Sequence, residues 1–491
     1  MSVCRTVSQP KIPPLMNAHH PHDDTQPSQV TLDHVMHEVG ALWKLAWPIL
    51  IGQLANIGMS VTDVAMAGHA SATDLAGVSL GVSIWNMIIL TIMGLVMSVS
   101  PLVAHHVGAR EYDAVPHVVR QGLWKAVIVS IIAFLIAQAA AFLFDHMDIE
   151  PGVRDVATSF VRVTSFGLPA FTLYRILYGY STSINQTKPM MVIALMALLL
   201  NGLINWVLVF GNWGAPALGG VGCAWSTTLC VWFNLIALVV WMHYSPAYRS
   251  TWPFKHFERP HRGKLKGLFK LGIPIGITHF AETSAFGLIA LLIAKYGSRE
   301  VSAHQIALNF TSLTFMVPLS VALALLTRVG QSLGAADPVE ARFRSWVGVG
   351  VTIMFSLLSA LGIALFRVEI AQAYTTDVAV IDAAAKLFLL AALFQLPDCV
   401  QVVTMSAIRG YKVTRAPMVL HLTAFWGFCL PLGCLLGLAP QWAPFAPATP
   451  MAAQGFWIAL TVGLSISASG LIVMLRRTAA RAIHNAAALG H

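Results

Sequence analysis

The stretch THFAETSAFGLIALLIA, residues Thr278 to Ala294, is an almost uninterrupted apolar run that contains one carboxylate, Glu282. About 20 helical residues at 1.5 Å each cross the roughly 30 Å hydrocarbon core of a bilayer, so the run has the character of a membrane span. Of the 491 residues, 57% are hydrophobic and only 10% are charged, and the mean hydropathy is +0.71. Soluble domains carry about 25% charged residues. The sequence therefore predicts an all-α integral membrane protein.

Apolar segments of this kind recur along nearly the whole chain, and their number predicts twelve transmembrane helices. The predicted spans are 41–67, 76–100, 121–144, 158–183, 190–211, 219–243, 272–296, 302–326, 346–366, 384–408, 417–437 and 454–475. In the polar segment 1–40, His19, His20 and His22 lie close together without the further residues of a metal site, and we expect a cytoplasmic tail. The cysteines form no C-x-x-C pair and are expected to be packing residues.

Loop charge predicts the orientation. With both termini in the cytoplasm, the inner loops and C-terminal tail from Val107 onward hold nineteen Lys and Arg residues, against three in the outer loops. The positive-inside rule favours this arrangement. Because the basic residues are dispersed over short loops, the net charge of +9 does not indicate a nucleic-acid partner. The layout predicts a multi-pass protein of the plasma membrane, bacterial inner membrane by expectation.

The two halves of the chain repeat each other. Pro48 and Pro274 lie 226 residues apart, as do Gly108 and Gly334, and several later matches lie 228 residues apart. We therefore expect two six-helix bundles related by a pseudo-two-fold axis along the membrane normal, an arrangement typical of transporters that alternate access. The predicted parts are a polar tail 1–40, an N-lobe 41–243, a basic cytoplasmic linker 244–271, a C-lobe 272–475 and a basic cytoplasmic tail 476–491.

Three carboxylates interrupt the predicted spans: Asp63, Glu282 and Asp398. Each ionisable group at mid-span costs roughly 2.5–3.5 kcal/mol on insertion scales, so each is expected to have a partner or a function. These carboxylates are not shared by the two halves of the repeat, because Asn56 and Ala170 occupy the positions equivalent to Glu282 and Asp398. A purely structural carboxylate, satisfied by neighbouring hydroxyls or a cation, is the alternative.

Helical spacing places further polar residues beside these carboxylates, because residues three or four apart share a helix face. The predicted faces are Gln53, Asn56, Ser60 and Asp63; Asn201 and Asn205; His279, Glu282 and Phe286; Gln305, Asn309 and Ser312; and Phe394, Asp398 and Gln401. Carboxylates, amides and hydroxyls are hard oxygen ligands that suit Na⁺ or H⁺ and match zinc or copper poorly. We therefore expect a cation-coupling site, with H⁺ or Na⁺ as the ion and no other cofactor.

Several motifs carry a resemblance to a known family. The motifs, in chain order, are GMSVTDVAMAG (58–68), HFAETSAF (279–286), SAHQIALNF (302–310), RVGQSLGA (328–335) and AIRGYK (407–412). Over about residues 40 to 475 the chain resembles the multidrug and toxic compound extrusion (MATE) family, in its NorM-like branch. The resemblance implies a V-shaped pair of six-helix bundles that exports organic cations and amphipathic drugs in exchange for Na⁺ or H⁺.

The same resemblance implies roles for individual residues. Asp63, with Asn201 and Asn205, corresponds to the N-lobe cation chamber. In the C-lobe, Glu282 and Asp398 correspond to the ion-site carboxylates, with a possible Na⁺ between them and Gln305 nearby. One position departs from the family pattern, because Phe394 stands where NorM-like members commonly have a tyrosine one turn before the second carboxylate. The missing hydroxyl weakens the expectation of a family-like Na⁺ site and leaves proton coupling open.

The cargo expected from this site is a small lipophilic cationic or amphipathic drug, which acidic groups, ring faces and methionines attract. The candidate cavity residues are Gln53, Asn56, Phe280, Phe286, Asn309, Phe394 and Gln401. Ordinary helix packing is the alternative for the phenylalanines. Besides membrane lipids we expect no macromolecular partner, and a monomer.

Other classes of membrane protein fit less well. The sequence lacks the G-x-x-x-x-G-K-[ST] loop of an ATP-driven pump, and it contains no H-E-x-x-H or G-x-S-x-G motif that would support an enzyme. An ion channel would conduct without a binding cycle. A flippase for lipid-linked sugars remains the alternative, although it should offer a basic cavity to a pyrophosphate, whereas the mid-membrane carboxylates here are acidic.

Overall fold

The computed structural model describes residues 31–144, 146, 150–439 and 447–489, and these residues form helices and connecting loops without any β-strand. His19, His20, His22 and Cys4 lie outside the described residues. The α-helices are α1 (Leu32–Ala70), α2 (Ala72–Val96), α3 (Val99–Gly108), α4 (Val115–Phe144), α5 (Pro151–Ser165), α6 (Leu168–Ser183), α7 (Lys188–Phe210), α8 (Gly220–Tyr244), α9 (Arg262–Ile293), α10 (Ser298–Gly334), α11 (Pro338–Leu365), α12 (Arg367–Tyr374), α13 (Val378–Gly410), α14 (Arg415–Leu422), α15 (Leu430–Leu438) and α16 (Ala452–Leu489), with a π-helical turn, η5 (Thr423–Cys429), between α14 and α15.

The prediction of an all-helical multi-pass membrane protein is confirmed. In the described part of the chain, eleven helices are long and apolar enough to span a membrane, and the pair α5 and α6, bent by 48°, makes the twelfth. Pro169 at the start of α6 explains the bend, because proline lacks the amide hydrogen that would continue the helix ladder from α5. Each of the twelve predicted spans falls on one of these helices or on this pair.

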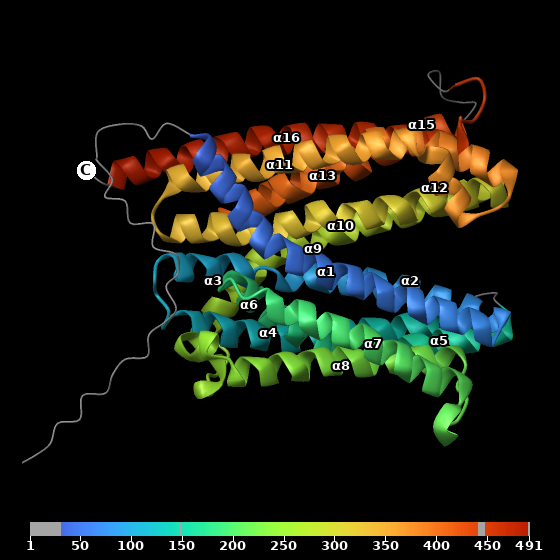
Figure 1. Ribbon diagram of the computed structural model, residues 1–491, viewed down its shortest axis with the longest axis horizontal. Coiled ribbons are helices and arrows are strands. Elements are labelled where there is room, and N and C mark those ends of the chain that lie inside the picture. Colours follow the sequence, from blue (N-terminus) through green and yellow to red (C-terminus); the bar gives the residue numbers. More distant parts are fainter. Residues whose placement is uncertain (1–30, 145, 147–149, 440–446, 490–491) are drawn as a thin grey trace, which may run out of the picture.

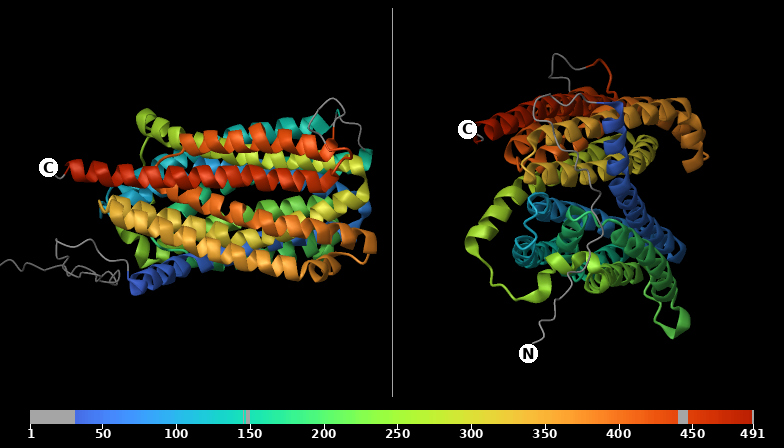
Figure 2. Two further views of the ribbon diagram at one scale, coloured as in Figure 1. Left: turned by 90° about the horizontal axis from the view of Figure 1, so that it is seen from above. Right: turned by 60° about the vertical axis from the view of Figure 1, so that its left-hand side comes forward.

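Two helices extend well beyond the predicted spans. Helix α1 begins at Leu32, where the side chain of Thr31 accepts a hydrogen bond from the amide of His34 and caps the first turn. Helix α16 continues to Leu489, and its last turns project beyond the rest of the bundle (Figure 2). The sequence after residue 475 is rich in Ala and Arg, which are strong helix formers, so no local signal ends the helix there.

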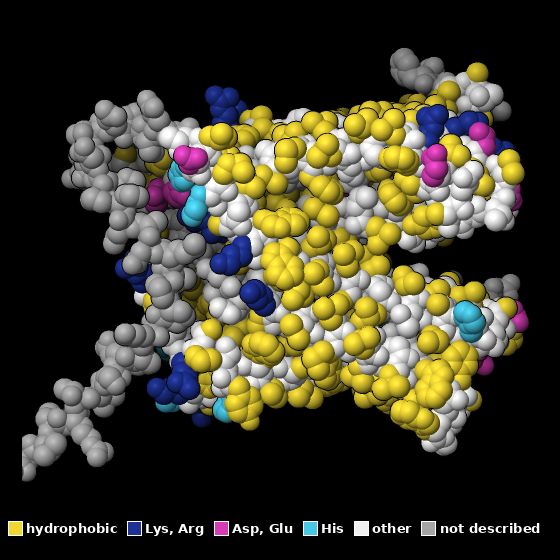
Figure 3. Space-filling view, in the orientation of Figure 1, with side chains coloured by type: hydrophobic (Ala, Val, Ile, Leu, Met, Phe, Trp, Pro, Cys, Tyr) yellow, Lys and Arg dark blue, Asp and Glu magenta, His cyan; other side chains and the backbone are white. Residues whose placement is uncertain are grey.

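The helices form two lobes arranged as a V. Helices α2 to α8 lie in one lobe, and α10, α11, α13, α15 and α16 lie in the other (Figure 1). The lobes touch at the end where α16 terminates, and a notch separates them at the opposite end (Figure 3). We call the first end the inner end, because loop charge predicts it to be cytoplasmic. The open side of the V then faces outward.

The first helix of each half crosses from one lobe to the other. In α1, Leu42 and Ile49 are buried in a core cluster with residues of α10, α11, α13 and α16, so the first half of α1 belongs to the C-lobe core. Its second half runs along the N-lobe (Figure 1). In α9, Leu268 is buried in the N-lobe core. Pro48 and Pro274 lie inside these helices at matching positions of the repeat.

The lobes make their tightest contact where α3 meets α10. A side chain at Gly108 would collide with the backbone of Gln331, and a side chain at Gly334 would collide with the backbone of His105. These two glycines are equivalent in the repeat, so the crossing is nearly symmetric. Two hydrogen bonds reinforce it: His105 Nε2 donates to the carbonyl of Gly410 at 2.9 Å, and Gln331 Nε2 donates to the carbonyl of Ser183 at 2.9 Å.

Buried charges secure the crossing helices at the inner end. Glu38 of α1 is 2% exposed and accepts two hydrogen bonds from Arg328 of α10, while Arg344 of α11 lies 3.4 Å from the same carboxylate. A bidentate arginine-carboxylate pair fixes both distance and orientation. The sequence offered no sign of this pairing, because its members are 290 residues apart.

Lys125 of α4 fastens the other crossing helix. Its ammonium is fully buried and donates to the hydroxyl of Ser98 at 2.8 Å and to the carbonyls of Leu95 and Leu268. The first two acceptors lie at the junction of α2 and α3, where the chain leaves carbonyl groups without helical partners. One cation thus joins α4, the α2–α3 junction and α9.

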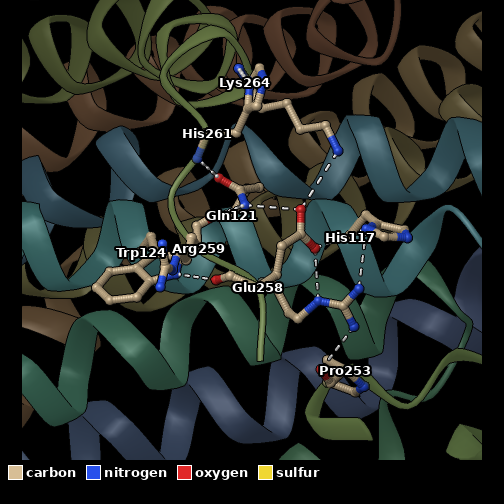
Figure 4. A network of polar contacts seen from close by, with 9 residues as sticks. His117, Gln121, Trp124, Pro253, Glu258, Arg259, His261 and Lys264 are labelled. Atoms are coloured by element: carbon tan, nitrogen blue, oxygen red, sulfur yellow. Dashed lines mark hydrogen bonds and ion pairs between the residues drawn. The ribbon is translucent and has the colours of Figure 1, made fainter. Parts of the chain in front are cut away.

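The linker between the lobes is held against α4 by Glu258 (Figure 4). Its carboxylate accepts hydrogen bonds from Arg120 Nε at 2.9 Å, His117 Nδ1 at 2.8 Å and Gln121 Nε2 at 3.1 Å, and Lys264 Nζ lies 3.7 Å away. Burial acts to raise the pKa of Glu258, but these donors outweigh it and lower the pKa from 4.5 to about 2. Further hydrogen bonds join the linker backbone to Trp124 and Gln121.

We expect Gly334→Ala to weaken the lobe contact, because its methyl group must displace the backbone of His105. The expected loss is about 1–3 kcal/mol, the usual cost of overpacking. Thermal unfolding in detergent measures it, together with the distance between spin labels placed on α3 and α10. Gly350→Ala is the control, because nothing lies within 4 Å of its added carbon; equal losses in the two variants would refute the assignment.

We expect Glu258→Gln to release the linker, because the neutral amide cannot replace a carboxylate that several donors share. Hydrogen bonds to charged groups contribute about 1.5–3 kcal/mol. Trypsin cleavage at Arg249 and Lys255 should therefore accelerate. Since the folded-state pKa is depressed, wild type should lose the same stabilisation as the pH falls from about 4.5 towards 2. Asp113→Asn, at an exposed position, should leave cleavage unchanged; unchanged cleavage in both variants argues against the anchor.

Candidate functional site

Among the described residues of the N-lobe, Asp63 of α1 is a buried carboxylate surrounded by donors. Asn201 and Asn205, one turn apart on α7, donate to its Oδ1 at 2.9 and 2.7 Å. Thr227 of α8 donates to Oδ2 at 2.6 Å. The structure therefore brings together the three residues that the sequence assigned to one chamber. Thr227 was missed, because a lone threonine in an apolar helix carries no spacing signal.

The surroundings of Asp63 contain amides, a hydroxyl and a thiol. Asn201 also donates to Ser226 at 3.1 Å, and Cys223 Sγ lies 3.3 Å from the carbonyl of Asp63. The side-chain oxygen of Asn205 is buried and has no hydrogen-bond partner in the described part of the chain. Buried polar atoms are rarely left unpaired, so this oxygen is available to a proton donor or a cation.

The polar stripe of α1 divides into two parts. Asp63 turns into the lobe and is 4% exposed, whereas Asn56 is exposed and Gln53 and Ser60 are half-buried. Within the described part of the chain, the hydrogen bonds to the Asp63 carboxylate come from α7 and α8, and these last three side chains do not take part in them. The assignment of Gln53 and Asn56 to a drug cavity remains a prediction.

The C-lobe carboxylates belong to a mixed cluster of charged and aromatic residues. Glu282 of α9 has a side chain that is 26% exposed, and its Oε2 lies 3.9 Å from Nε2 of His421, a fully buried residue of α14. Asp398 of α13 is 8% exposed and close enough for its charge to act on Glu282. Arg409, also on α13, is a second buried residue of this helix that carries a charge.

Several polar atoms in this cluster have no hydrogen-bond partner among the described residues. They are Nε2 of His279, both ring nitrogens of His421 and the side-chain oxygen of Gln401. Gln401 lies three residues after Asp398 on α13, so its oxygen can join the carboxylates in holding Na⁺. Helix α13 continues through Pro397, which removes one backbone donor just before Asp398. The C-lobe cluster is thus less satisfied than that of Asp63.

The aromatic candidates lie in two different environments. Phe280 is 47% exposed. Phe286 and Phe394 pack against each other with ring centroids 6.5 Å apart, and Phe394 also contacts Trp457 at 5.4 Å. These two rings belong to the C-lobe core, beside the carboxylates. The position that departs from the family pattern, Phe394, is 3% exposed, so its ring fills a packed site.

Gln305 and Asn309 share an exposed face of α10, together with Ser312. The structure gives neither Gln305 nor Asn309 a hydrogen bond to Glu282 or Asp398 within the part of the chain it describes. Their roles in ion or drug binding remain predictions.

Sequence reasoning missed Arg409 and His421. Arg409 lies in the AIRGYK motif, and its position beside a basic loop made it count as a loop charge. In the structure it is 5% exposed, with its guanidinium inside the bundle. His421 is an isolated histidine in an apolar segment, the usual appearance of a packing residue. Only the approach of α9 and α14 shows that His421 faces Glu282.

A two-lobed bundle of membrane-length helices, with buried carboxylates in each lobe, is the architecture of a membrane transporter and not of an enzyme. The MatE family model matches residues 48–207 and 274–435. The chain is 38% identical over 447 residues to the multidrug resistance protein PmpM of Pseudomonas aeruginosa, covering 91% of this chain and 93% of that protein. It is 39% identical over 438 residues to the multidrug resistance protein NorM of Vibrio vulnificus, covering 89% and 95%.

The fold is similar to that of the eukaryotic MATE transporter AtDTX14, with a TM-score of 0.82 at 20% identity over 92% of this chain and 99% of that one. The chain belongs to the MatE family. The resemblance stated from the sequence motifs, in the NorM-like branch, is thereby confirmed.

We expect Asn205→Leu to destabilise the N-lobe, because leucine has a similar size but cannot donate to Asp63. Leaving a buried charged group short of one donor costs about 1–3 kcal/mol. Thermal unfolding in detergent measures the loss. Asn56→Leu is the matched control on an exposed surface of α1. Equal stability of Asn205→Leu and wild type would show that the amide does not support the carboxylate.

Proposed function

We propose that this protein is a secondary active multidrug exporter that exchanges H⁺ or Na⁺ for organic cations and amphipathic drugs. The observation that carries the proposal is the incompletely satisfied cluster around Glu282 and Asp398. A carboxylate pair inside a membrane bundle favours a bound cation, because two like charges near one another are costly in a medium of low dielectric constant. The names of the two relatives, both multidrug resistance proteins, support a drug as the cargo.

Transport would proceed by alternating access. The V is open at the outer end, and the contacts that close the inner end include the Gly108 and Gly334 crossing and the hydrogen bonds of His105 and Gln331. Rocking the lobes about this region would break these contacts and open the cavity to the cytoplasm. Proton or Na⁺ binding to the outward-open state would then favour drug release.

Each lobe would contribute differently. Asp63 already accepts three hydrogen bonds, so only a small ion could reach its carboxylate without displacing these donors. Glu282 is partly exposed, and Phe286, four residues later, shares its face of α9, which supports a larger, lipophilic cation at the C-lobe. We propose that the protein works as a monomer in the bacterial inner membrane.

The experiment is transport in liposomes. Purified protein is reconstituted, and movement of the fluorescent cation ethidium is followed under an imposed pH gradient or Na⁺ gradient. We expect one gradient to drive ethidium, and we expect Glu282→Gln to lower the rate at least tenfold, because the glutamine carries no charge. Glu369→Gln, an exposed residue of α12, is the control and should transport as wild type does.

Two results would count against the proposal. If neither gradient moves ethidium in the wild type, the cargo is of another kind, and a lipid-linked sugar becomes the substrate to assay. If Glu282→Gln transports at the rate of the control, the carboxylate has a structural role only.

A further inference from the structure

A groove lies at the inner end of the C-lobe, between α16 and the segment that joins α13 to α14. Its volume is about 530 Å³, within the roughly 300–1,000 Å³ range of small-ligand sites. Tyr411, Val413 and Ala416 form one wall, and α16 forms the other. Glu282 and Asp398 are not among the described residues that line it, so the groove is separate from the C-lobe carboxylates.

The residues of α16 that line the groove share one face of the helix. Gly470, Val473, Arg477 and Arg481 follow one another at intervals of three or four residues, which places them on the same side. At Gly470 this face meets α14, because a side-chain carbon there would lie 2.7 Å from Cδ2 of Leu420. The groove therefore begins where α14 and α16 touch.

Towards the inner end, α16 outlasts the helix that packs against it. Helix α14 begins at Arg415, only five residues from its contact at Leu420, whereas α16 continues from Gly470 to Leu489. The last turns of α16 project beyond the rest of the bundle (Figure 2). The face that carries Arg477 and Arg481 is thus left without a neighbouring stretch of α14.

The groove changes from apolar to basic along its length. Leu420 and Val473 line its apolar part, and Val473 is 49% exposed. Arg477 and Arg481 follow one and two turns later; both are exposed, and neither has a hydrogen bond or an ion pair with another described residue. Because the last predicted span ends at residue 475, these guanidinium groups lie at the level of the membrane interface.

This combination selects one kind of occupant. The planar guanidinium group matches the geometry of a phosphate, and basic pockets between membrane helices on the cytoplasmic side bind anionic head groups. A soluble anion would leave Val473 and Leu420 uncovered, and an uncharged lipid would leave the arginines unpaired. A second copy of the chain would bring basic residues to a basic surface, because the sequence of α16 contains no Asp or Glu.

We propose that the groove between α14 and α16 binds an anionic phospholipid of the cytoplasmic leaflet. Its phosphate lies between Arg477 and Arg481, and one acyl chain runs along Val473 and Leu420. The lipid fills the space that α14 leaves beside α16 and fixes the projecting helix to the membrane surface. This site goes beyond the proposed transport function and depends on neither the cargo nor the coupling ion.

The test is native mass spectrometry of the purified, delipidated full-length protein in detergent. Dioleoylphosphatidylglycerol and dioleoylphosphatidylcholine serve as probes, because they share acyl chains and a phosphodiester but differ in net charge. We expect the first phosphatidylglycerol to bind about tenfold more tightly than phosphatidylcholine. A basic residue near an anionic lipid contributes about fivefold in affinity, so Arg477→Gln and Arg481→Gln should each weaken phosphatidylglycerol binding by about this factor, and more strongly together.

Arg476→Gln is the matched control. It removes the same charge from an exposed neighbour on α16 that is not among the described residues lining the groove, so binding should stay within about twofold of wild type. Ala416→Phe tests the apolar wall, because its ring enters the groove without changing the charge. It should weaken phosphatidylglycerol binding about fivefold or more.

Four results would overturn the inference. Unchanged binding in the double variant Arg477→Gln with Arg481→Gln shows that the arginines hold no lipid, and an equal loss in Arg476→Gln shows only a general effect of charge. Displacement of the lipid by an equal concentration of glycerol 1-phosphate assigns the groove to a soluble anion. A lipid-free mass of two copies that the Ala416→Phe variant loses assigns it to a second chain.

Discussion

The close approach of α3 and α10 at Gly108 and Gly334 is the contact on which the two-lobed arrangement depends. At both glycines the neighbouring backbone occupies the space of a side chain, so the helices meet without intervening side chains. Small residues are the usual means by which helices associate in lipid, where burial of apolar surface supplies little driving force. The crossing brings His105 and Gln331 into hydrogen-bonding range of the opposite lobe. Together with the crossing of α1 and α9 between the lobes, this contact holds the lobes together at the inner end, and they separate towards the outer end.

Much of the fold could be predicted from the sequence, because lipid imposes a length and an apolar character on every span. The twelve spans and the repeat were read correctly from runs such as Thr278–Ala294 and from the spacing of Pro48 and Pro274. The exchange of α1 and α9 between the lobes was not predicted from the sequence. Hydropathy reports that Leu42 is buried in an apolar medium, but it does not report which lobe surrounds it.

The candidate site was likewise predicted only in part. Asp63, Asn201 and Asn205 were grouped correctly because a carboxylate and two amides in apolar helices each need partners, and few partners are available. His421 was missed because its significance depends on how α14 approaches Glu282, and Arg409 because its burial depends on the helices around α13. Helical periodicity predicts which face of one helix is polar, and it carries no information on which helix lies opposite.

The exchange of the first helices has a consequence for biosynthesis. Helix α1 leaves the ribosome first, yet Leu42 and Ile49 find their packing partners in α10, α11, α13 and α16, which are made hundreds of residues later. Until these helices have been inserted, the first half of α1 lacks its packing partners and Glu38 lacks Arg328. The C-lobe is consequently incomplete as an independent unit, and its final closure on α1 is a late step that joins the two ends of the chain.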